Sequence, residues 1–213
     1  MSARPPTAAE PDASLGDLAA AGAFVIGLIA AWLYLAGWTY AYHYFDRFGV
    51  PLRLADLPKE HYFVYGAAVA RGRLGWVFGF VAAGLGLGIF WRRLPVARRR
   101  QRLLLAAVIV LGLFWLGQTA GISAAHARYA EQRAADYGAY PRLQVWLKGE
   151  SAQGGDPRPD LASGCYRLLL HNQDRLLLFR PFKGAPAAEL PVVILPWADV
   201  MEVRILPDYT SCR

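Results

Sequence analysis

Three long stretches without a charged residue constrain the fold of this chain more than any other feature. They cover residues 18–45, 74–91 and 103–125, which are 28, 18 and 23 residues long. A helix of about 20 apolar residues is long enough to cross the hydrocarbon core of a bilayer. The sequence therefore predicts that residues 18–138 form a domain of three transmembrane helices.

Six arginines lie in the short segment 92–102, between the second and third predicted spans. An excess of Lys and Arg marks loops on the cytoplasmic side of a membrane. Because successive spans alternate in direction, we expect residues 1–17 to be a disordered cytoplasmic tail and the segment after the third span to be exported. The arginines of the cytoplasmic loop are Arg92, Arg93, Arg98, Arg99, Arg100 and Arg102.

These arginines account for most of the net charge of +7. Charge confined to one loop differs from the basic face of a folded nucleic-acid-binding domain, so we expect no nucleic-acid partner. Basic residues beside a membrane attract anionic lipid headgroups by about 1 kcal/mol each. We therefore expect the six arginines to contact membrane lipids, and the alternative is a specific lipid or protein site in the same loop.

The first span ends in a group of aromatic residues, and a short loop follows it. Trp38, Tyr40, Tyr42, Tyr44 and Phe45 would surround the end of a helix with rings. Aromatic side chains are enriched where a membrane meets water. We expect the loop 46–60 either to fold over the outer membrane surface or to pack beneath the exported domain.

Residues 139–213 differ from the rest of the chain because apolar and polar side chains alternate there. A period of two indicates half-buried strands, over residues 143–147, 166–170, 175–179, 192–195 and 201–206. Residues 171–174 have the composition of a hairpin turn, and 196–199 predict a tight turn or one helical turn. The predicted fold class is an α+β membrane protein with three transmembrane helices followed by a small exported antiparallel β domain.

Both cysteines of the chain, Cys165 and Cys212, lie in the predicted β domain. Disulfides form in exported segments and stabilise small domains whose cores are marginal. The sequence therefore predicts a Cys165–Cys212 disulfide, and two buried free thiols are the alternative.

Glycines are frequent in the second predicted span, where we expect them to form helix-packing faces. Pairs of small residues four positions apart let helices approach closely in lipid. Such faces allow the second span to pack between the other two, and the alternative is that one face joins a partner subunit. The residues concerned are Gly75, Gly79, Gly84, Gly86 and Gly88.

Candidates for chemistry are few. His43, His61 and His126 fall at the outer ends of the three spans, where imidazoles could hold a metal ion or relay a proton. Metal-ligand spacings such as HxxxH, serine-hydrolase elbows and nucleotide motifs are all missing from the sequence. We therefore expect no enzymatic activity, no resident metal and no cofactor, with a histidine-based enzyme or proton relay as one alternative.

The function expected from this pattern is that of an integral membrane anchor or accessory subunit. Its exported β domain would contact another membrane protein or a second copy of the chain. A self-associating transport or channel component is a further alternative. The high content of Arg and Ala and the low content of Lys favour a bacterial inner membrane with a periplasmic domain.

Overall fold

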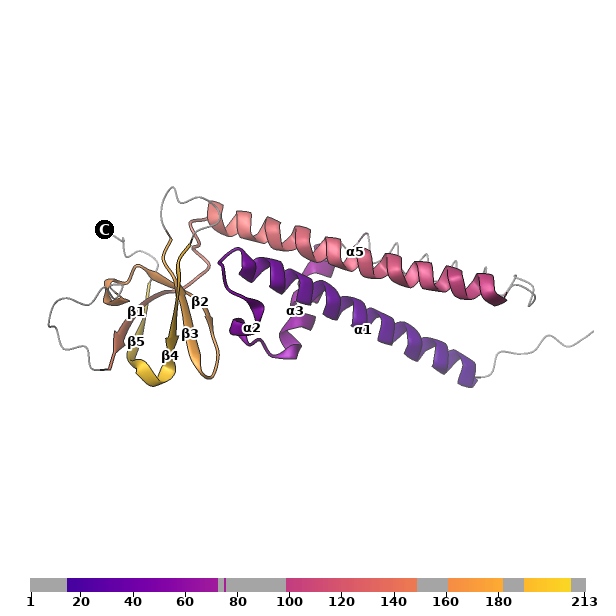
Figure 1. Cartoon of the computed structure of the whole chain (residues 1–213), viewed down its shortest axis with the longest axis horizontal. Coiled ribbons are helices and arrows are strands. Elements are labelled where there is room, and N and C mark those ends of the chain that lie inside the picture. The colour runs from indigo at the N-terminus through magenta and orange to yellow at the C-terminus, as the bar shows by residue number, and fades with distance from the viewer. Residues whose placement is uncertain (1–14, 73–74, 76–98, 149–160, 182–189, 208–213) are drawn as a thin grey trace, which may run out of the picture.

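The computed structural model describes residues 15–72, 75, 99–148, 161–181 and 190–207. The described part of the protein is elongated, with long helices forming one end and a small sheet the other (Figure 1). The helices are α1 (Leu15–Asp46), α2 (Leu52–Ala55), α3 (Lys59–Arg71) and α5 (Arg99–Ala134).

Two of these helices are long and apolar enough to cross a membrane. The candidate spans are Val25–Asp46 in α1 and Ala107–Ala134 in α5. In the most apolar 18 residues of each span, only 22% and 17% of the stretch are buried within the protein. The described residues therefore contain two candidate membrane helices, where the sequence predicts three. The second predicted span, 74–91, lies outside the described residues except for Gly75 and stays a prediction.

Helix α1 packs between α3 and α5, which lie mainly on different sides of it. Contacts between α1 and α5 run in the same direction along both helices, from Gly117 beside Trp32 to Gly121 beside Ala36. Helices α1 and α5 are therefore parallel, and both end next to the sheet (Figure 1).

The sheet has five strands in the order β4-β3-β2-β1-β5, and every neighbouring pair is antiparallel. The strands are β1 (Arg142–Leu147), β2 (Tyr166–His171), β3 (Arg175–Phe179), β4 (Val192–Pro196) and β5 (Val200–Leu206). The prediction of a small antiparallel β domain is therefore confirmed, because each expected strand overlaps an observed one.

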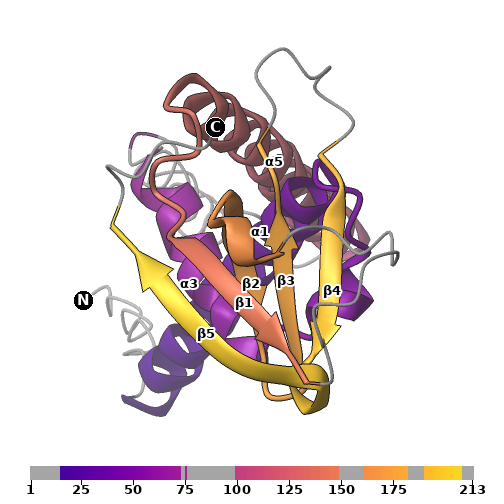
Figure 2. The ribbon, with the colours of Figure 1, turned by 90° about the vertical axis from the view of Figure 1, so that its left-hand side faces the viewer.

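The sheet is strongly curled because its two edge strands are linked by a very short connection. Strands β4 and β5 lie at opposite edges, yet only the 3₁₀ turn Trp197–Asp199 joins them. The backbone N–H of Trp197 donates to the oxygen of Asp174 (2.9 Å), and that of Lys148 donates to the oxygen of Asp199 (2.8 Å). These bonds fix the turn across the end of the sheet, so the strands form a partly open barrel (Figure 2).

The two faces of the curled sheet pack against different partners. Its inner face encloses a largely aliphatic cluster with the 3₁₀ turn Leu161–Ser163. This inner cluster comprises Leu143, Val145, Leu161, Tyr166, Leu176, Leu178, Leu195 and Val200. Along β3, Leu177 and Phe179 point the other way and join a cluster with the ends of the helices. Both faces of β3 are therefore buried.

Candidate functional site at the helix–sheet junction

A group of aromatic rings joins the helices to the outer face of the sheet. Phe179 of β3 lies at the centre, with ring centroids 5.2 Å from Phe48, 5.2 Å from Tyr137 and 5.3 Å from Tyr140. Phe48 also contacts Tyr129 of α5 at 5.4 Å. We call these five residues the aromatic junction. Aromatic pairs in such edge-to-face arrangements add stability beyond the area that they bury.

The chain reaches the aromatic junction through two unusual backbone segments. After α1, Gly49 adopts a φ of +65°, which carries the chain back so that Phe48 and Val50 are each only 2% exposed. After α5, Asp136 and Tyr137 adopt φ values of 50° and 55°, a region that residues other than glycine rarely occupy. The loop after α1 thus packs beneath the sheet, which is one of the two positions that the sequence predicts for it.

A buried arginine fixes the segment between α5 and β1. Arg167 of β2 is 3% exposed, and its Nη1 donates hydrogen bonds to the backbone oxygens of Tyr137 and Tyr140, both at 2.8 Å. A buried charge is costly unless hydrogen bonds compensate it. The burial of Arg167 cannot be read from the sequence, because a charged residue within a predicted strand is expected on the exposed face.

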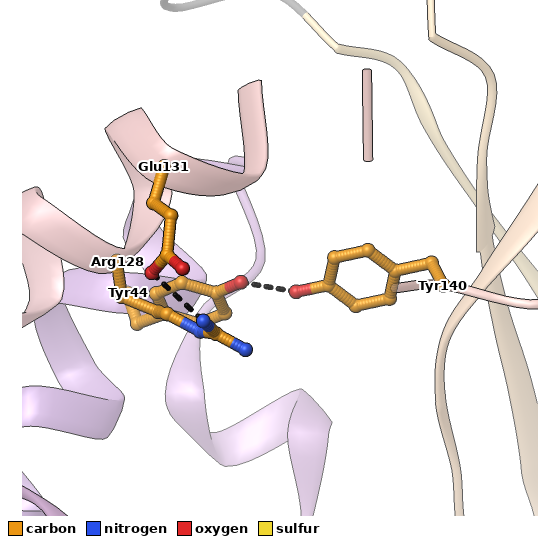
Figure 3. Close-up of polar contacts among 4 residues, drawn as sticks. All are labelled: Tyr44, Arg128, Glu131 and Tyr140. Carbon is orange, nitrogen blue, oxygen red and sulfur yellow. Dashed lines mark hydrogen bonds and ion pairs between the residues drawn. The ribbon is translucent and has the colours of Figure 1, made fainter. Parts of the chain in front are cut away.

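Tyrosine hydroxyls connect α1 to the same segment. Tyr44 Oη and Tyr140 Oη share a hydrogen bond, and the ion pair between Arg128 and Glu131 (2.8 Å) lies beside Tyr44 (Figure 3). Burial raises the pKa of Tyr140 from 10.0 to about 12, and burial also raises the pKa of Tyr137. Both phenols are therefore neutral at physiological pH, so their hydroxyls serve as hydrogen-bonding groups and carry no charge.

The structure brings two of the three predicted histidines together. The rings of His43 and His126 lie 6.2 Å apart, and Arg47 Nη2 lies 3.0 Å from His126 Nε2. His61 is on α3, exposed, with its ring 6.4 Å from that of Tyr65. No group of three His, Cys, Asp or Glu side chains in the described ranges could hold a metal ion.

Glycines do bring helices into close contact, at positions that the sequence analysis did not single out. A Cβ atom on Gly37 would overlap the backbone of Tyr62, and one on Gly66 would overlap the backbone of Leu33. A Cβ atom on Gly121 would lie 2.6 Å from the oxygen of Ala36. The spacing of Gly117 and Gly121, four residues apart, is the sequence signal that could have identified the α5 face.

The predicted packing glycines belong to the second span. Gly79, Gly84, Gly86 and Gly88 lie outside the described residues. Gly75 is described, and a Cβ atom added there would meet nothing within 4 Å. Their role in helix packing stays a prediction.

The remaining predicted residues do not belong to the aromatic junction, and several lie outside the described ranges. Cys165 is buried, whereas Cys212 lies outside the described residues, so their pairing stays a prediction. Arg92, Arg93 and Arg98 are also outside. Arg99, Arg100 and Arg102 lie in the first turns of α5, at the end of the helix opposite the sheet (Figure 1).

The fold is thus a bundle of long apolar helices whose ends carry a curled five-stranded sheet. No family model matches the chain, and neither a curated protein nor a solved structure does.

Proposed function

We propose that the chain is an integral membrane protein whose helices α1 and α5 cross the bilayer. The supporting observation is that large apolar side chains are exposed along both helices. The core helix of a water-soluble protein would bury such side chains. The exposed side chains are Val25, Ile26 and Ile29 on α1, and Leu104, Val108, Leu111, Phe114 and Trp115 on α5. Contiguous apolar surface of this kind marks a contact with lipid or another protein.

The positions of the arginines and the sheet support a definite orientation. The start of α5, with Arg99, Arg100 and Arg102, lies at one end of the helices and the sheet at the other. Because positive residues favour the cytoplasmic side, the sheet would face outwards. In a bacterial inner membrane, the sheet would then be periplasmic.

The proposed role is that of a non-enzymatic anchor or accessory subunit that presents the sheet to a protein partner. The observation that carries this role is the aromatic junction, which holds the sheet in a fixed position on the ends of the apolar helices. Strand β5 is an edge of the sheet, and its Met201 and Ile205 are 64% and 71% exposed. Exposed edge strands can pair with an added strand from a partner.

Membrane insertion is tested by carbonate extraction and by protease protection of a tag at each end of the chain. We expect the protein to stay in the membrane pellet, with the C-terminal tag cut from outside and the N-terminal tag protected. Release by carbonate would overturn the membrane proposal, and the opposite protection pattern would overturn the orientation.

The partner role is tested by crosslinking intact cells and identifying proteins that copurify in mild detergent. We expect a stoichiometric membrane partner that is lost in Ile205→Glu, because a charge would enter the exposed edge of β5. The matched control is Gln173→Glu, in the exposed turn between β2 and β3, which should retain the partner. A protein that copurifies only with itself would overturn this role and favour the transport alternative.

A further inference from the structure

The end of α1 and the last turns of α5 bring basic side chains together on the surface next to the sheet. Arg47 Nη2 lies 3.0 Å from His126 Nε2. A guanidinium can only donate, so Nε2 accepts and the proton of a neutral His126 lies on Nδ1. This bond orients the Arg47 guanidinium and leaves most of its five N–H groups available for another acceptor.

His43 adds a third donor to the same surface. Its ring lies 6.2 Å from that of His126 at an interplanar angle of 89°. His126 is exposed, and both His43 and Arg47 are half-buried. The three side chains therefore come from two segments far apart in sequence and remain accessible from outside.

The charge of Arg47 is not neutralised by a carboxylate in the described part of the chain. The ion pairs there join Arg128 to Glu131 and Arg204 to Glu202, and neither includes Arg47. Glu131 is thus already bound by Arg128 at 2.8 Å. An uncompensated guanidinium that a neighbouring imidazole holds in place is well suited to an anion.

Exposed aromatic rings lie next to the three basic side chains. Trp38 and Tyr42 stack with centroids 5.6 Å apart, are 40% and 44% exposed, and Tyr42 contacts His43 at 5.2 Å. Partly exposed Trp and Tyr rings are typical of the boundary between hydrocarbon and headgroups. In the orientation proposed above, His43, Arg47 and His126 would lie at the level of the outer headgroups.

We propose that His43, Arg47 and His126 form a binding site for a phosphate group. This inference rests on the proposed membrane insertion of α1 and α5. A guanidinium matches phosphate oxygens with paired N–H groups, and each such charge-assisted bond is roughly twice as strong as a neutral one. The phosphate belongs to an anionic phospholipid headgroup or is a free phosphate ion, and the chemistry of the site is the same for both.

The test uses the purified full-length protein in detergent, with native mass spectrometry to count bound phosphatidylglycerol and a separate titration with inorganic phosphate. We expect Arg47→Gln to weaken phosphatidylglycerol binding at least tenfold. The control Arg53→Gln changes an exposed arginine of α2 and should bind like the wild type. Binding of both probes would identify free phosphate as a ligand, and binding of phosphatidylglycerol alone would identify the headgroup.

If wild type and Arg47→Gln bind each probe with the same affinity, the proposed site is wrong. If Arg47→Gln does not fold, judged by its thermal unfolding, His43→Gln provides the same comparison. Carbonate extraction of each variant separates this result from failure of the membrane proposal. Release of the wild type overturns membrane insertion, whereas membrane retention with unchanged binding overturns only the phosphate site.

Discussion

The middle of α1 and the end of α1 pack against their neighbours in different ways. In the middle, Gly37 and Ala36 touch the backbones of α3 and α5 directly, and the ring of Tyr34 packs beside them on Tyr62 and Phe63. At the end, Tyr44 and Phe45 are buried in the same cluster as Phe48, Tyr129 and Phe179.

This difference is what a change of solvent along one helix would produce. In lipid, burying apolar side chains gains little, so close contact through small residues drives helix association. In water, burying large rings is strongly favourable. The direct backbone contacts at Gly37 and Gly121 give way to the large buried cluster at the last turns of α1, which agrees with a membrane boundary there.

The largest effect is expected where the backbones touch. Gly37→Leu places a Cβ atom within the backbone of Tyr62, and a backbone cannot move aside as a side chain can. We expect Gly37→Leu to lower the free energy of unfolding by more than about 4 kcal/mol, which exceeds the usual cost of overpacking a core. Thermal unfolding of the protein in detergent measures this loss of stability. Gly22→Leu is the matched control, because nothing lies within 4 Å of a Cβ atom there; equal effects at both sites would contradict the close contact.

The next effect concerns the aromatic junction. Phe179→Ala removes the ring that contacts Phe48, Tyr137 and Tyr140, and we expect a cost of about 3–4 kcal/mol. Hydrogen exchange should show the sheet loosened from the helices while the inner cluster stays protected. Leu178→Ala, one residue earlier and facing the inner cluster, should instead expose the strands themselves. The same exchange pattern in both variants would show that the two faces of β3 form one cooperative unit.

A smaller effect is expected from the buried arginine. Arg167→Gln removes a charged donor from the oxygens of Tyr137 and Tyr140, at a cost of about 2–3 kcal/mol. The control Arg204→Gln changes an exposed arginine on β5, whose contacts with Glu202 and the ring of Trp146 lie at the surface, and should cost about 1 kcal/mol or less. Equal unfolding temperatures for the two variants would exclude a role for Arg167 in holding this segment.

The smallest effect is expected when the hydroxyl group of Tyr140 is removed and its ring is kept. Tyr140→Phe removes the hydrogen bond with Tyr44 and should cost about 1 kcal/mol at neutral pH. Below pH 10 this phenol is protonated in both folded and unfolded chains, so it adds no pH dependence. Above pH 10 the unfolded chain loses the proton, whereas the folded chain keeps it up to a pKa of about 12.

The free energy of unfolding therefore falls as the pH rises from 10 towards 12. Tyr140→Phe should make this fall shallower, measured as unfolding temperature against pH. Tyr42→Phe changes an exposed tyrosine and serves as the control. An unchanged slope in Tyr140→Phe would contradict the raised pKa.

The sheet was predictable from the sequence because alternation reports directly on burial. Leu143 and Val145 are each 1% exposed, as their period of two predicts. The hairpin turn and the turn at Trp197 also followed from local composition. The histidines were less predictable, because His61 lies at the start of α3, whereas His43 and His126 lie towards the ends of α1 and α5.

The candidate site could be predicted only in part. The aromatic residues at the end of α1 indicated a boundary, but nothing local distinguished the exposed Trp38 and Tyr42 from the buried Tyr44 and Phe45. The packing glycines Gly37 and Gly66 each lie four residues before an alanine, Ala41 and Ala70, but such pairs of small residues occur at many places in these apolar helices and so did not single out these two.

The sequence by itself determined the apolar helices, the strands and the separation of the arginines from the β domain. These features depend on interactions over a few residues, or on the composition of one segment. Only the tertiary structure decided that Phe48, Tyr137 and Phe179 meet, that Arg167 is buried, and that Arg47 lies beside His126. Such contacts join segments tens of residues apart, and they depend on how helices and sheet pack together.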